Sequence, residues 1–248
     1  MTQSGATFAS PAKYAILGTS GREVSAVFQR DYILRMIEMM GDLMRRVKEL
    51  MDELAQMRLL EEACRRQCGL PLSALETLSA ASLTEMLSPT PRLFASELIY
   101  LRAMASPDLW EEGRMLRLKS LRLLLTLAEE GPLCELRAPR VQALKVELMD
   151  LLLPEDLMAC AVFLGQGGAY ADMEDALFEA AERCAPPERE AFVRTGAQML
   201  REAARAPAAD LAFARTSAHE LRLSARELEE RWTAPCDSLQ PDRGEETR

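Results

Sequence analysis

The apolar residues between Ile33 and Met57 recur at spacings that alternate between three and four, and this pattern restricts the fold more than any other feature of the chain. Such spacings place one side chain per turn on the same side of an α-helix, whereas a half-buried strand needs alternation at every second residue. The pattern predicts one long helix over residues 31–67, ended by the glycine and proline of residues 68–71. The positions in the stripe are Ile33, Met36, Met40, Leu43, Val47, Leu50, Leu54 and Met57.

A second apolar column, formed by Ile37, Met44 and Met51, widens this stripe. A two-stranded coiled coil usually carries charges at such flanking positions, so the width favours a helix packed in a bundle or in a groove. Methionine side chains suit both settings because they adapt to irregular surfaces, and the cover can come from the same domain or from another chain. For a partner-binding face, the predicted anchors are Ile33, Met36, Ile37, Met40, Leu43, Met44, Val47, Leu50 and Met51.

Composition and turn signals favour an all-α fold. Aromatic residues make up 5% of the chain, and good helix formers such as Leu, Ala, Met, Glu and Arg dominate it. Prolines and Ser-x-x-Glu capping boxes, as at Ser73–Glu76 and Ser82–Glu85, divide residues 73–232 into shorter helices. We expect stacked antiparallel helical hairpins, either tetratricopeptide-like or an irregular helical bundle, after the long N-terminal helix.

The two ends of the chain differ from the middle. Residues 1–29 are rich in small residues and residues 233–248 are polar, and neither has a sustained period. We expect a disordered arm and a disordered tail around a helical domain at residues 30–232. The start lacks a charged segment followed by an apolar run, and internal apolar runs are shorter than the roughly 20 residues that cross a bilayer. A cytoplasmic protein with no membrane partner is therefore expected.

Two resemblances support the hairpin prediction. Gly168, Tyr170, Leu177 and Ala180 have the spacing of a Gly-x-Tyr turn followed by small and large residues on one face. This hairpin, around residues 154–184, resembles the second half of a tetratricopeptide motif, although Met173 stands where that motif has alanine.

The second resemblance rests on the segments DYILRMIE, from Asp31 to Glu38, and ASELIYL, from Ala95 to Leu101. Together with the Gly-x-Tyr hairpin they make residues 31–232 resemble a family of uncharacterised helical proteins from Gram-positive bacteria. The resemblance implies a long first helix followed by tetratricopeptide-like hairpins. It implies no activity.

Few residues of the chain suit metal or acid–base chemistry. The single histidine, His219, leaves most metal-hydrolase and charge-relay arrangements without the imidazole they need. Cys64 and Cys68 stand one helical turn apart and could supply two ligands to a soft metal, but zinc needs two more. Six cysteines spread through helical sequence are expected to be reduced thiols. We predict no metal and no cofactor.

Two charged clusters have structural explanations. Asp172, Glu174 and Asp175 follow a glycine turn at a predicted helix start, where the helix dipole favours carboxylates. The basic residues of the second cluster spread around their helix and lack aromatic neighbours that would stack on bases, so we expect them to meet acidic partners on neighbouring helices. They are Arg114, Arg117, Lys119 and Arg122. The net charge of −9 also argues against nucleic acid as a partner.

These observations predict a non-enzymatic α-helical scaffold that binds a protein or peptide, or itself, through apolar helix faces. One alternative is a small-ligand-binding protein or enzyme with a pocket between helices. Another is a regulator that contacts nucleic acid. No motif in the chain decides between them.

Overall fold

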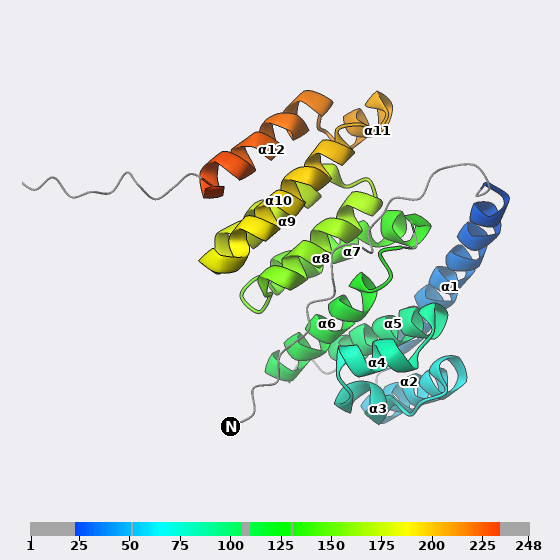
Figure 1. The fold of residues 1–248 in the computed structure, drawn as a ribbon. Helices are drawn as coiled ribbons and strands as arrows, with labels where there is room; N and C mark the ends of the chain where they lie inside the picture. The colour runs from blue at the N-terminus through cyan, green and yellow to red at the C-terminus, as the bar shows by residue number, and fades with distance from the viewer. Residues whose placement is uncertain (1–22, 51, 106–109, 130, 234–248) are drawn as a thin grey trace, which may run out of the picture.

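The computed structural model describes residues 23–50, 52–105, 110–129 and 131–233, and every regular element in them is an α-helix (Figure 1). The prediction of an all-α fold is confirmed. None of the described helices has the length and apolar character needed to cross a bilayer. The helices are α1 (Glu23–Glu49), α2 (Glu53–Cys68), α3 (Leu72–Thr77), α4 (Ala80–Met86), α5 (Pro89–Ala105), α6 (Trp110–Leu125), α7 (Gly131–Glu147), α8 (Pro154–Gln166), α9 (Tyr170–Arg183), α10 (Pro186–Ala203), α11 (Ala208–Phe213) and α12 (Ala218–Thr233).

The single long helix predicted over residues 31–67 is wrong, because α1 ends at Glu49 and α2 begins at Glu53. Polar side chains at the junction satisfy the backbone groups that a helix end leaves unpaired. The Asp52 carboxylate accepts a hydrogen bond from the Leu54 amide at 3.2 Å, and the Gln56 side-chain amide donates to the carbonyl oxygens of Val47 and Leu50 at 3.1 and 2.7 Å. The predicted end of the segment is confirmed, since α2 stops at Cys68 and Gly69 adopts the left-handed conformation.

The first helix also begins earlier than predicted, at Glu23, inside the segment expected to be a disordered arm. The other residues predicted to be disordered, 1–22 and 234–248, lie outside the described residues. Helix α1 packs against α2, α5 and α7.

The helices after α4 pack as pairs, of which α5–α6, α8–α9 and α10–α12 have the most extensive contacts (Figure 1). Helix α7 joins the series by packing on α8 and, more lightly, on α1 and α6. The hairpin predicted around residues 154–184 is α8–α9. Its likeness to a tetratricopeptide repeat stays a resemblance.

Small residues allow these helices to approach closely. Ser96 on α5 and Ser120 on α6 are buried, and each hydroxyl donates to the other residue's carbonyl oxygen, at 2.9 and 2.8 Å. Gly167, after α8, lies against the backbone of Cys134, so a Cβ added there would be 2.7 Å from the Cys134 carbonyl oxygen. Gly167 thus serves the packing of α8 on α7, whereas Gly165 lies against Met173 of α9.

Both predicted capping boxes are wrong. Helix α3 already includes Ser73, and the Glu76 carboxylate binds Arg102 on α5 at 2.6 Å. Helix α4 is capped three residues earlier than predicted, by the Ser79 hydroxyl, which accepts from the Ser82 amide at 3.0 Å. Closely spaced serines offer several equivalent caps, and tertiary packing decides which is used.

Candidate interaction groove

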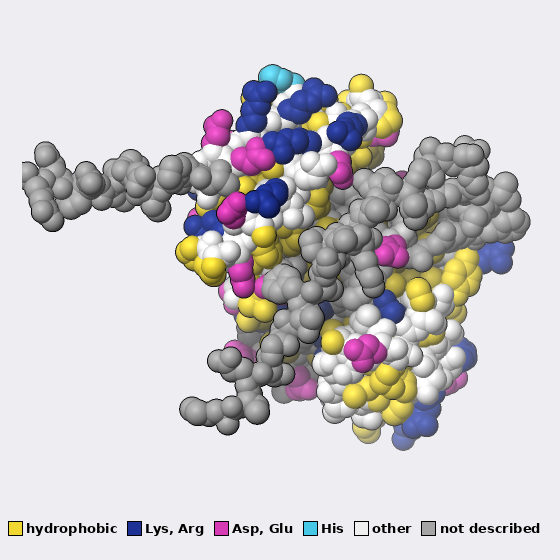
Figure 2. Space-filling view, in the orientation of Figure 1, with side chains coloured by type: hydrophobic (Ala, Val, Ile, Leu, Met, Phe, Trp, Pro, Cys, Tyr) yellow, Lys and Arg dark blue, Asp and Glu magenta, His cyan; other side chains and the backbone are white. Residues whose placement is uncertain are grey.

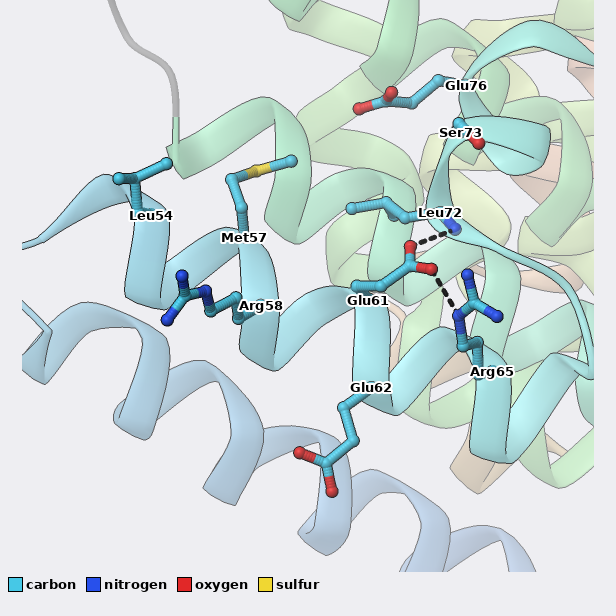
Figure 3. A pocket seen from close by; sticks show the side chains of 9 residues that line it. All are labelled: Leu54, Met57, Arg58, Glu61, Glu62, Arg65, Leu72, Ser73 and Glu76. Carbon is cyan, nitrogen blue, oxygen red and sulfur yellow. Dashed lines mark hydrogen bonds and ion pairs between the residues drawn. The ribbon is translucent and has the colours of Figure 1, made fainter.

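An open groove with a volume of about 580 Å³ lies between α2 and α3 (Figure 3). Its apolar floor comes from Leu54 and Met57 on α2 and from Leu72 at the start of α3. Its rims are polar and carry both signs of charge. The polar lining residues are Arg58, Glu61, Glu62, Arg65, Ser73 and Glu76.

Glu61 holds the two helices of the groove together. Its carboxylate accepts a hydrogen bond from the Leu72 backbone amide at 2.7 Å and one from Arg65 Nε at 2.5 Å (Figure 3). The Leu72 amide is one of the backbone donors that have no partner within α3, because it lies in the first turn of that helix. These two interactions keep the pKa of Glu61 below its ordinary value, because both favour the charged carboxylate.

Leu54 is the exposed apolar residue of the groove. Its side chain lies at the start of α2 and is 68% exposed, while Met57 one turn later is half-buried and Leu72 is buried. Two charged residues of the lining, Arg58 one turn after Leu54 and Glu62 two turns after it, make no hydrogen bond or ion pair with any other described residue. The groove thus combines an apolar floor with unpaired charges of both signs.

The predicted anchors do not line this groove. Ile33, Met36, Met40, Leu43 and Val47 are buried, so the chain's own helices cover this face of α1. Three other anchors, Ile37, Met44 and Leu50, are half-buried, and Met51 lies outside the described residues. Binding of a partner by these four residues stays a prediction.

A second hollow, of about 380 Å³, lies between α1 and α2. Met40 and Leu43 from the predicted set contribute to its floor. Its charged residues are exposed, in contrast to the buried reactive groups that an enzyme pocket usually contains. They are Arg35, Glu38, Asp42, Arg46, Glu62 and Arg66.

No protein-family model, curated protein or solved structure matches this chain. The Gram-positive helical family therefore stays a resemblance of short segments. The function has to be inferred from the contacts and charges of the chain itself.

Three of the four basic residues in the cluster on α6 have the acidic partners that the sequence predicts. Arg122 forms a bidentate pair with Asp156 at 2.9 and 2.7 Å, Arg114 binds Asp150, and Arg117 binds Glu147. Lys119 donates to the carbonyl oxygens of Leu75, at 3.1 Å, and Glu76. These cations are occupied by groups of the same chain, which leaves little charge for phosphate contacts. On the described part of the face over α10 and α12, basic and acidic side chains are interspersed (Figure 2).

The other candidates for chemistry are dispersed. Among the described residues, no three His, Cys, Asp or Glu side chains come close enough to hold a metal together. His219 is exposed on α12, far in sequence from the two thiols of α2. Asp172 and Glu174 lie on α9, and burial raises the pKa of both carboxyls.

The raised pKa of Glu174 predicts how pH affects stability. Its carboxyl is half-buried against α12, near Asp175, Glu220 and Glu227, and accepts a hydrogen bond from Ser224 at 2.7 Å. A carboxyl whose folded-state pKa is raised stabilises the fold below its unfolded pKa, and this contribution is lost as the pH rises through the folded pKa. Glu174→Gln should therefore gain stability relative to wild type between pH 4 and pH 7. Thermal unfolding at both pH values measures this.

The control for this prediction is Glu230→Gln. Glu230 is an exposed residue of α12, the helix against which Glu174 packs. Its stability difference from wild type should change little over the same pH range. An unfolding temperature for Glu174→Gln that falls relative to wild type as the pH rises would contradict the assignment.

Proposed function

We propose that this protein is a non-enzymatic helical scaffold that binds an amphipathic helical segment of a partner protein in the α2–α3 groove. The observation that carries this proposal is the exposure of Leu54 at the end of an apolar groove with charged rims. Grooves of this kind bind helices that present apolar residues at every third or fourth position. The cytoplasm is the proposed compartment, because the five cysteines of the described residues are free thiols.

The rim indicates the chemistry of the partner segment. Arg58 is available to an acidic side chain, and Glu62 is available to a basic one, because neither is paired within the described part of the chain. Glu61 is already held by Leu72 and Arg65, so it serves the shape of the groove. The partner segment should therefore carry an apolar stripe flanked by charges of both signs.

The test replaces Leu54 with Asp. A bound partner would bury the Leu54 side chain, and burial of a leucine stabilises a complex by about 1.5–3 kcal/mol. Its loss should therefore weaken partner binding by roughly ten- to a hundredfold. The matched control is Met86→Asp on α4, because Met86 is 57% exposed and does not line the groove. A photoreactive amino acid at position 54, and separately at position 86, identifies what contacts each surface in the native cell. Circular dichroism checks that both variants fold.

Two outcomes discriminate between the candidates. A specific crosslinked protein at position 54 that is absent at position 86, and that binds the Leu54→Asp variant more weakly than wild type, supports the groove. Light scattering shows whether that protein is a second copy of this chain. If Leu54→Asp keeps the wild-type partners at wild-type affinity, the groove is not the binding surface.

A further inference from the structure

Helix α11 presents an apolar tip at one end of the molecule (Figure 1). Of its six residues only Leu211 is buried, and its exposed residues include Ala208, Ala209, Ala212 and Phe213. Phe213 is 91% exposed, the highest value among the large hydrophobic residues that the structure describes. Hydrophobic side chains are visible over α11 in the space-filling view (Figure 2). A protruding aromatic side chain of this kind suits insertion into a hollow of another molecule.

The turn after α11 fixes the position of this tip. Arg215 adopts the left-handed conformation, with a φ of 57°, so the chain turns sharply at the end of α11. The Thr216 amide donates to the Leu211 carbonyl oxygen at 3.0 Å, and the Arg215 amide donates to that of Ala212 at 3.1 Å. Phe213 therefore projects from a hydrogen-bonded turn, which lowers the cost of ordering it in a complex.

Charged residues of both signs surround the tip. Arg205, Asp210 and Arg215 are exposed, and their side chains make no hydrogen bond or ion pair with any other described residue. Helix α11 thus carries an exposed apolar face between charges of both signs. This is the chemistry that the α2–α3 groove requires of a partner segment.

We propose that α11 of a second copy of this chain occupies the α2–α3 groove. The inference rests on the proposed function, because it names the partner for the same groove. Leu54 and Phe213 are the two most exposed large hydrophobic residues of the described chain, at 68% and 91%. Insertion of Phe213 beside Leu54 and Met57 removes both exposed side chains from water in one contact.

The charges of the two surfaces are complementary. The unpaired Arg58 of the groove can bind Asp210 of the incoming α11. The unpaired Glu62 can bind Arg205 or Arg215. Each charge that lacks a partner within its own chain thus gains one across the contact.

The two surfaces lie at opposite ends of the molecule, so α11 cannot enter the groove of its own chain (Figure 1). The contact therefore joins two copies head to tail. It leaves a free groove on one copy and a free α11 on the other, so the assembly extends as an open chain instead of closing as a symmetric dimer. An interface based on a six-residue helix is small, and we expect a dissociation constant on the order of 10–100 µM.

Sedimentation velocity of the full chain between about 10 and 500 µM tests this association. The average mass of wild type should rise with concentration and exceed that of two chains. Phe213→Asp removes the tip and Leu54→Asp removes the floor of the groove. Each substitution should weaken association about tenfold or more, because an apolar side chain is lost from the contact. Circular dichroism checks that both variants fold.

Mixing the two variants tests the head-to-tail geometry. Phe213→Asp keeps an intact groove, and Leu54→Asp keeps an intact α11. An equimolar mixture should therefore form a complex of one chain of each kind, which cannot grow further. The control is Val146→Asp, because Val146 on α7 is 63% exposed and belongs neither to α11 nor to the groove. This variant should associate as wild type does.

The proposal is overturned if wild type stays monomeric over this range, if either single variant associates as wild type does, or if their mixture forms no complex. Loss of association in Val146→Asp would overturn it as well. A monomeric wild type whose position 54 crosslinks to a different protein overturns the self-assembly alone, and the groove then remains the partner site. The failure of this inference is thus distinguishable from the failure of the proposed function.

Discussion

Glu97→Ala is expected to lower the free energy of unfolding by about 3–5 kcal/mol, the largest effect of any single substitution proposed for this chain. Glu97 on α5 is 1% exposed, and its two carboxylate oxygens bind Arg137, at 2.9 Å, and Arg140, both on α7. Removing the carboxylate leaves two mostly buried guanidinium groups without their counter-charge. Burial already lowers the pKa of Arg137, and the charge of Glu97 opposes this effect.

Urea denaturation of wild type and variant measures the difference. The control is Glu190→Ala, which removes an exposed carboxylate from an ion pair with Arg194 four residues away on α10. Such exposed pairs contribute about 0–1 kcal/mol, so this variant should unfold nearly as wild type does. If Glu97→Ala were as stable as Glu190→Ala, the buried network would not hold α5 and α7 together.

Gly167→Ala should destabilise the fold by about 1–3 kcal/mol, because the added methyl group collides with backbone. The new Cβ would lie 2.7 Å from the carbonyl oxygen and 2.8 Å from the carbonyl carbon of Cys134. These atoms cannot move aside by a change of rotamer. The φ angle of Gly167 is −84°, which alanine adopts freely, so the expected loss comes from the collision and not from the backbone conformation.

Gly41→Ala provides the matched comparison, because Gly41 lies inside α1 and a Cβ there meets nothing within 4 Å. This variant should gain about 0.5–1 kcal/mol from the higher helix propensity of alanine. The two substitutions are chemically identical and should change the unfolding midpoint in opposite directions. Equal midpoints in thermal unfolding would show that α7 and α8 are not packed as closely as described.

The all-α fold and the α8–α9 hairpin could be predicted from sequence because composition, proline positions and the Gly-x-Tyr turn agree with one another. The break between α1 and α2 was hidden by the same apolar spacing that predicts helix on both sides of it. The sequence contains a weak indication of this break, because Asp52 is a preferred N-cap residue and Gln56 follows one turn later.

The groove could not be predicted, because it depends on how α3 turns back onto α2. Glu61 has no local feature that indicates a hydrogen bond to Leu72, eleven residues away. Leu54 and Met57 belong to the predicted stripe, yet they face the groove while Ile33 and Met36 face the core. Periodicity identifies which residues share a helix face, and only tertiary packing decides what covers that face.

The hydrogen bonds from Lys119 to the end of α3 have a consequence for the order in which the molecule is assembled. Helix α3 has six residues, too few to persist alone in water, and the side chain that binds its last carbonyl oxygens comes more than forty residues later in the chain. A nascent chain leaving the ribosome therefore completes one wall of the groove only after α6 has emerged. The proposed groove therefore reaches its full shape only when about half of the chain has been synthesised.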